Sequence, residues 1–267
     1  MKMMFFNKQK SDKAIYKKLG YMTDQEGILR RFLYEEQGWR AHLDNSKQSI
    51  REFYADKNYK TIAIFGSGWL LDVPIADLLR DFEQIYLCDI SHPRQITHKY
   101  RYCENLHFVE CDITGGFARH IYECLYRKKA YTAADIFNFV PNFGFLPKTL
   151  DCMVSLNVLN QLDGLLLDAM EGAMRLSSDE IVRFKTLIQT QHVTLLSAYN
   201  YCLISDCEQI SISQKNGGRK EMPLIFVFGH AQCPQLPPLR HEWLWKFDSQ
   251  GHYESDTIVQ FRVKAFF

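Results

Sequence analysis

The sequence predicts an α/β protein in which helices cover both faces of a mostly parallel sheet. Short apolar runs alternate with helical stretches between residues 60 and 205, as in βαβ units. The runs are apolar throughout, which is typical of strands buried on both faces. Two β-rich runs near the end of the chain flank a turn and predict an antiparallel hairpin. We therefore expect a doubly wound three-layer sandwich with a seven-stranded sheet, the C-terminal hairpin and an N-terminal helical extension.

The expected elements follow in chain order. Apolar residues recur at three- to four-residue spacing in residues 1–57, which predicts an N-terminal helical extension, and residues 58–267 form the sheet domain. Parallel strands are expected at 61–65, 84–89, 106–112, 150–156 and 193–197. Connecting helices are expected at 72–79, 118–128 and 165–189, and the hairpin at 242–247 and 258–266. Residues 206–240 contain turn signals but no clear element.

Composition excludes several classes of protein. The 267 residues carry a net charge of +1, which argues against a general nucleic-acid coat protein. Residues 1–60 hold 13 Lys/Arg against 8 Asp/Glu, so a nucleic-acid substrate stays open although it is disfavoured. No apolar stretch approaches the roughly 20 residues that span a bilayer, and no secretory signal is recognisable. The eight cysteines lack a C-x-x-C pair, which indicates thiols in a reducing cytoplasm. No His/Cys set has metal-ligand spacing.

Three strand ends carry the candidate binding residues. Gly66-Ser67-Gly68 follows the first strand, Asp89 ends the second and Asp112 ends the third. Ligands of open α/β sheets bind beyond the carboxyl ends of the strands. Glycines let the backbone approach a ligand, Asp89 suits the hydroxyls of a ribose, and Asp112 with the Ile113 N–H suits an adenine edge. The alternative is that the glycines form a tight turn and both aspartates cap helices.

These segments resemble the class I S-adenosylmethionine-dependent methyltransferases. The matching stretches are Ile62-Ala63-Ile64-Phe65-Gly66-Ser67-Gly68, Leu87-Cys88-Asp89-Ile90, Val109-Glu110-Cys111-Asp112-Ile113-Thr114 and Asp151-Cys152-Met153-Val154-Ser155-Leu156-Asn157-Val158-Leu159. The resemblance covers residues 60–205 well and the tail loosely. It implies S-adenosyl-L-methionine as cofactor, a methyl acceptor as the partner, and eight cofactor-binding residues: Gly66, Ser67, Gly68, Asp89, Ile90, Asp112, Ile113 and Asn157.

Methyl transfer needs an acceptor atom held in line with the methyl group, and a base only when the acceptor must lose a proton. Strand-end topology offers Asn157 after the fourth strand, Tyr199 after the fifth and His92 after the second as catalytic candidates. Helix capping by the amide, aromatic packing and an idle loop histidine are the respective alternatives. Trp69 can cover the cofactor or pack on the N-terminal helices.

Two other functions compete with a methyltransferase whose acceptor is a small molecule or a protein side chain. An NAD(P)-dependent oxidoreductase would have a small residue at position 71, where this chain has Leu71. A non-catalytic scaffold would retain the fold without the cofactor. Ile64 and Leu70 support the scaffold, because the resembling family often has an acid and a third glycine at those positions.

Overall fold

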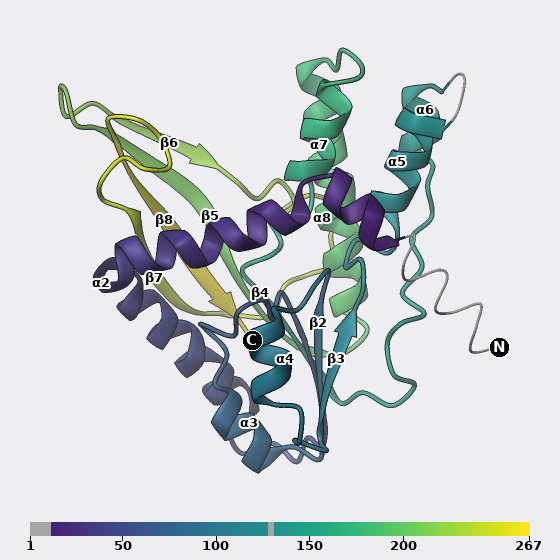
Figure 1. Ribbon diagram of the computed structural model, residues 1–267, viewed down its shortest axis with the longest axis vertical. Coiled ribbons are helices and arrows are strands. Elements are labelled where there is room, and N and C mark those ends of the chain that lie inside the picture. The colour runs from purple at the N-terminus through teal and green to yellow at the C-terminus, as the bar shows by residue number, and fades with distance from the viewer. Residues whose placement is uncertain (1–11, 128–130) are drawn as a thin grey trace.

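A single sheet organises the fold. The computed structural model describes residues 12–127 and 131–267, so residues 1–11 of the expected extension and Lys128 of the helix expected over 118–128 lie outside the described residues. Five strands run parallel in the spatial order β3-β2-β1-β4-β5, and β8 and β7 continue the sheet antiparallel (Figure 1). Their bounds are β1 Thr61–Phe65, β2 Gln84–Asp89, β3 Leu106–Glu110, β4 Cys152–Leu156, β5 Asn200–Ser213, β7 Leu239–Asp248 and β8 Thr257–Phe266. The expected α/β class with its C-terminal hairpin is confirmed.

The sheet has eight strands, one more than expected. The additional strand, β6 (Arg219–Pro223), pairs antiparallel with the far part of β5 through a turn at Gly217 and Gly218. All five residues of β6 are exposed. A strand with no buried face has no hydrophobic pattern, which is why β6 was not predicted within residues 206–240.

The strand expected at 193–197 is wrong, because these residues end helix α8 (Ser178–Leu196). A capping box between Ser177 and Glu180 begins this helix, and Val193 and Leu196 are buried at helical spacing. A short β-branched run cannot be distinguished from a buried helical segment by composition. The true strand, β5, begins at Asn200, which pairs with Cys152 at the start of β4.

Helices form a layer on each face of the sheet. Ile62 and Ile64 of β1 face the layer of α2 (Tyr21–Tyr54), α3 (Ile75–Asp81) and α4 (Arg94–Lys99). Ala63 and Phe65 face the layer of α5 (Phe117–Arg127), α6 (Ala133–Phe137), α7 (Gly164–Glu171) and α8. The helical region expected over 165–189 is therefore divided between α7 and α8. None of the described helices combines the length and apolarity needed to cross a membrane.

Helix α2 bends at Glu35, where φ is −114° and ψ is 22°. Figure 1 shows its first half crossing the sheet near the carboxyl ends of the parallel strands and its second half returning toward α3. The Glu35 carboxylate accepts hydrogen bonds from the Ser249 N–H (3.0 Å) and hydroxyl (2.8 Å). After the bend, Trp39 packs against Trp245 of β7, with ring centroids 4.7 Å apart. Contacts with β7 and the turn after it thus hold α2 at its bend.

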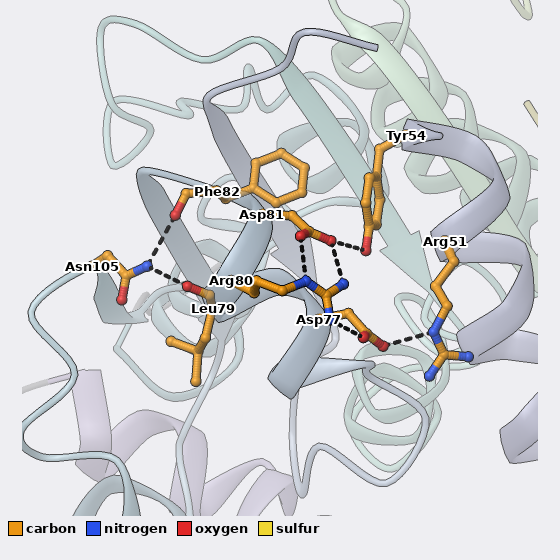
Figure 2. A network of polar contacts seen from close by, with 8 residues as sticks. All are labelled: Arg51, Tyr54, Asp77, Leu79, Arg80, Asp81, Phe82 and Asn105. Carbon is orange, nitrogen blue, oxygen red and sulfur yellow. Dashed lines mark hydrogen bonds and ion pairs between the residues drawn. The ribbon is translucent and has the colours of Figure 1, made fainter. Parts of the chain in front are cut away.

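A polar network joins the end of α2 to α3 (Figure 2). The Arg51 Nε–H donates to Asp77 (2.7 Å), and the Tyr54 hydroxyl donates to Asp81 (3.1 Å). Arg80 forms ion pairs with both aspartates. The arginines are substantially exposed, so solvent screens these pairs and they contribute little to the stability of the fold. The network orients the two helices, while apolar burial supplies most of their stability.

Candidate functional site

A cavity opens at the carboxyl ends of β1, β2, β3 and β4, beneath the first half of α2. It contains all eight residues that the sequence assigned to the cofactor, namely Gly66, Ser67, Gly68, Asp89, Ile90, Asp112, Ile113 and Asn157. The first half of α2 adds Tyr21, Asp24, Gln25 and Ile28, and its second half adds Trp39, His42 and Leu43. Segments far apart in the chain therefore meet at the edge of the sheet where open α/β folds bind ligands.

The glycine turn after β1 needs its first glycine. Gly66 has φ +79°, and a Cβ there would lie 2.2 Å from Val158 Cγ1 and 2.5 Å from the Leu156 carbonyl oxygen. Any side chain at this position would push the turn away from the end of β4. Leu70, where the resembling family often has its third glycine, has φ +57°, a conformation that costs a leucine energy. Leu70 thus adopts the left-handed backbone conformation that glycine favours.

Asp89 joins the end of β2 to that turn. Its Oδ2 accepts from the Gly68 N–H (2.8 Å), and its Oδ1 accepts from the Ile90 N–H (2.7 Å). An ionised carboxylate has about four acceptor sites, so both oxygens retain capacity for a pair of ligand hydroxyls. Burial raises the pKa of Asp89, and the nearby His92 acts in the opposite direction.

Asp112 holds the start of α5 through the same carboxylate that the sequence assigned to an adenine. Its Oδ1 accepts from the Thr114 N–H (2.9 Å) and hydroxyl (2.5 Å), and its Oδ2 accepts from the Ala118 N–H (3.0 Å). Burial raises its pKa. Asp112 therefore caps the start of a helix, as the alternative expectation held, and it also lines the cavity.

Of the three predicted catalytic residues, only Asn157 lines the cavity. His92 is 7% exposed, with its Nε2 3.4 Å from the Val109 carbonyl oxygen and its ring against Phe108. Tyr199 precedes β5 and lies at the amino-end edge of the sheet, because the strand expected before it is helical. The premise that placed Tyr199 at the mouth is therefore corrected.

Trp69 connects the glycine turn to α2 and lines the cavity. Its indole Nε1–H donates to the Gln25 carbonyl oxygen (2.9 Å), and the Gln25 side chain donates to the Ser91 carbonyl oxygen (2.7 Å). These two hydrogen bonds hold the first half of α2 over the ends of β1 and β2. Trp69 therefore contacts the N-terminal helix α2, as one of the two expectations held, and its role in covering the cofactor stays a prediction.

His42 and Asp72 belong to the cavity wall, and sequence reasoning gave neither a role in the site. The Asn157 Nδ2 donates to Asp72 Oδ2 (2.9 Å) and lies 3.3 Å from His42 Nε2. Burial raises the pKa of Asp72 to about 6 and lowers that of His42 to about 3. Helix α3 begins at Ile75 without a side-chain cap, which leaves the Asp72 carboxylate available to the cavity.

The described residues contain no group of three or more His, Cys, Asp or Glu side chains that could hold a metal ion. The phenylalanines between α6 and β4 lie elsewhere: Phe139 stacks on His120 of α5, and Phe143 packs against Gly115. The cavity is lined by the strand ends and the segments after them, by α2, by Leu165 of α7 and by Trp245 of β7.

Comparisons with known proteins gave only remote similarities. No protein-family model matches the chain, and no curated protein matches it. Among solved structures, the N-methyltransferase NodS from Bradyrhizobium japonicum WM9 with S-adenosyl-L-homocysteine aligns at 8% identity and a TM-score of 0.36, covering 83% of this chain and 85% of that chain.

Two further structures align over most of their length. The 1,6-didemethyltoxoflavin-N1-methyltransferase of Burkholderia thailandensis gives 10% identity and a TM-score of 0.35, covering 92% of this chain and 90% of that chain. The plantazolicin methyltransferase BpumL gives 12% identity and a TM-score of 0.33, covering 98% and 99%. At such low scores and identities, the function has to be inferred from this chain's own residues.

Proposed function

We propose that this chain is an S-adenosylmethionine-dependent methyltransferase whose cofactor binds in the cavity beneath α2. The single observation that carries the proposal is that all eight residues of the cofactor motif line this one cavity. They come from the ends of four strands that span nearly one hundred residues of sequence. Their convergence at the carboxyl edge of the sheet is what an adenosine-containing ligand requires.

The residues present fit such a cofactor. Asp89 offers a carboxylate with free acceptor capacity to a ribose. Ile90, Ile113, Leu162 and Tyr21 supply an apolar and aromatic surface for a base. The Ser67 hydroxyl is buried and has no hydrogen-bond partner among the described residues, so it is available to a ligand. When bound, the cofactor would supply an electrophilic methyl group on a sulfonium ion.

The protein's own part is to position the acceptor and to exclude water. The hydrogen bonds of Trp69 and Gln25 hold α2 across the mouth, which restricts the acceptor to a few orientations. We assign the helical segment up to residue 57 as a cap on the methyltransferase domain of residues 58–267. His92 and Tyr199 take no part in this assignment because neither lines the cavity. The eight motif residues keep their proposed role in binding the cofactor. For Asp112 that role is to hold the loop between β3 and α5 in place through its hydrogen bonds.

A thermal-shift experiment on the full chain with S-adenosylmethionine, S-adenosylhomocysteine, NADH and buffer tests this function. A ligand at about 100 times its Kd adds roughly 2.7 kcal/mol to the free energy of unfolding, which raises the Tm of a domain of this size by a few degrees. We expect both sulfur nucleosides to raise the Tm and NADH to have no effect. Stabilisation by NADH alone would favour the oxidoreductase, and no stabilisation by any ligand would favour a scaffold.

A further inference from the structure

One end of the cavity is formed by Asn157 and by four residues outside the cofactor motif, namely Trp39, His42, Asp72 and Trp245. We call it the Asp72 end. The His42 ring stacks on Trp245 with centroids 3.9 Å apart and planes 5° from parallel. Trp39 packs edge-on against the same indole. These rings make a flat apolar wall next to a carboxylate and an amide.

His42 is not a proton acceptor here. The Trp243 indole N–H donates to His42 Nδ1 (3.2 Å). The Nδ1 position is thus occupied by the indole N–H, and burial lowers the pKa of His42 to about 3, which keeps the imidazole neutral. Asp72 is therefore the proton acceptor at this end.

The charge of the cavity is one-sided. Asp24, Asp72, Asp89 and Asp112 are among the described residues that line it, and Lys and Arg are absent from that lining. Asp89 and Asp112 belong to the proposed cofactor motif, and Asp24 lies 3.9 Å from Arg31. Asp72 forms no ion pair with a described residue; burial raises its pKa, and the charge of Lys47, which is outside the lining, acts in the opposite direction. A ligand with a phosphate or carboxylate next to Asp72 would bring two like charges together in a buried place, which costs free energy.

Two polar atoms at the Asp72 end lack partners among the described residues. Asn157 is 7% exposed, and its Oδ1 accepts no hydrogen bond. Trp245 is 6% exposed, and its Nε1–H donates none. Buried polar groups are nearly always paired, so both atoms indicate a ligand. Asn157 Oδ1 and the Asp72 carboxylate are both acceptors, so together they suit a group with several hydrogen-bond donors. The Trp245 indole N–H suits a neutral oxygen elsewhere on the same ligand.

Resting on the proposed function, we propose that the methyl acceptor is an amine without phosphate or carboxylate groups, bound with its amino group at Asp72 and Asn157. The ammonium form donates to the Asp72 carboxylate and to Asn157 Oδ1. Its apolar body lies against the wall of His42, Trp39 and Trp245. An alcohol fits the cavity less well, because a carboxylate is too weak a base to remove a hydroxyl proton.

The reaction balances with Asp72 as the base. The ammonium group gives one proton to the Asp72 carboxylate, which frees the nitrogen lone pair. That pair forms the N–C bond to the methyl carbon of S-adenosylmethionine while the S–C bond breaks and its electrons stay on sulfur. The products are an N-methylammonium ion and S-adenosylhomocysteine. Burial raises the pKa of Asp72 to about 6, which makes its carboxylate a better base than an ordinary aspartate.

The test measures binding of matched probes to the full chain saturated with S-adenosylhomocysteine, by isothermal titration calorimetry. The amines are phenethylamine, tryptamine and butylamine. Phenylacetate, indole-3-acetate and butyrate are their carboxylate counterparts, and 2-phenylethanol is the neutral control. We expect at least one amine to bind at least tenfold more tightly than its carboxylate. Asp72→Asn should weaken that amine at least tenfold and leave the Kd for S-adenosylhomocysteine unchanged. Asp81→Asn, in the distant network of Figure 2, removes a carboxylate and should change neither value.

The outcomes separate the two proposals. Failure of S-adenosylhomocysteine to bind would contradict the proposed function itself. If S-adenosylhomocysteine binds normally, three results would overturn the amine inference alone. These are that no amine binds, that the carboxylates bind as tightly as the amines, or that Asp72→Asn leaves the amine affinity unchanged. Urea denaturation of Asp72→Asn shows that the variant is folded. The transfer of a labelled methyl group from S-adenosylmethionine to the amine that binds then tests Asp72 as the base. Asp72→Asn should abolish this transfer.

Discussion

Asp206 is a buried carboxylate whose environment favours its protonated form. It is 2% exposed near the end of the parallel part of β5, where it accepts one hydrogen bond from the Asn160 side chain (2.9 Å), and no described residue donates to its Oδ1. Burial raises its pKa to about 7, and Asp72 adds to that effect. The folded state thus holds a proton that the unfolded chain, with a pKa near 3.9, releases.

This difference makes stability depend on pH in a defined direction. Between about pH 4 and 7 the unfolded state loses the Asp206 proton first, so the free energy of unfolding falls as the pH rises. Asp206→Asn removes that loss and keeps an oxygen for Asn160. We expect the variant to exceed the parent by roughly 2–4 kcal/mol at pH 8 and by under about 1 kcal/mol at pH 4. Urea denaturation at both pH values measures it. A constant difference would contradict the burial of this carboxylate.

At the residue scale, the sequence predicted those site residues that lie at or just after the end of a strand. Gly66, Gly68 and Asp89 follow their strands directly, so topology alone brings them together. His42, Asp72 and Asn157 meet across separations of 85 and 115 residues, and no local pattern signals such a contact. The sequence could not decide whether Asp112 binds a ligand or caps a helix, because either role places an aspartate after the third strand.

At the element scale, α2 is the helix that packs on the sheet through β7 and β5. Its apolar side buries Trp39, Leu43, Ile50 and Phe53, while its last turn forms the partly exposed ion pair of Arg51 with Asp77 in Figure 2. The Trp39 indole N–H also donates to the Phe247 carbonyl oxygen (2.9 Å). Burial of the indole and this hydrogen bond should therefore outweigh the ion pairs in holding the helix.

Two substitutions on α2 separate these contributions. Trp39→Ala should lower the free energy of unfolding by about 3–5 kcal/mol, because it empties a large buried site. Arg51→Ala should lower it by at most about 1 kcal/mol, since its ion pair with Asp77 is partly exposed. Urea denaturation compares the two. If both variants lost equal stability, the ion pairs and not the aromatic contacts would fix α2.

Elements were predictable where their hydrophobic pattern was unambiguous. The first four strands are buried apolar runs and were found within a few residues of their true bounds. The fifth prediction, at 193–197, failed because Val193-Thr194-Leu195-Leu196 has the composition of a strand and the burial of a helix. The bend of α2 at Glu35 depends on Ser249, which lies 214 residues away, so no local signal could indicate it.

At the scale of the whole molecule, topology decides where the site lies. The parallel strands in the order β3-β2-β1-β4 bring their carboxyl ends to the cavity, and the first half of α2 lies over that edge. Alternating strands and helices predicted this arrangement, because crossovers between parallel strands are almost always right-handed. The strand β6 escaped prediction because it carries no buried face. The N-terminal helical extension was expected, but the hydrogen bonds of Gln25 and Trp69 that hold α2 at this edge were not, since they join residues far apart in the chain.

The measurement that tests the central claim most directly is calorimetric titration of S-adenosylhomocysteine into the parent chain, Asp89→Asn and Asp151→Asn. Asp151 is the matched control. Its carboxylate also accepts two backbone N–H groups, from Lys60 (2.8 Å) and Thr61 (2.9 Å), but at the amino-end edge of the sheet. We predict one site per chain and a Kd about 10- to 100-fold weaker in Asp89→Asn, as expected for the loss of hydrogen bonds to a charged group. Asp151→Asn should keep the parent affinity. No binding to the parent chain, or equal binding to all three proteins, would contradict the cavity as the cofactor site.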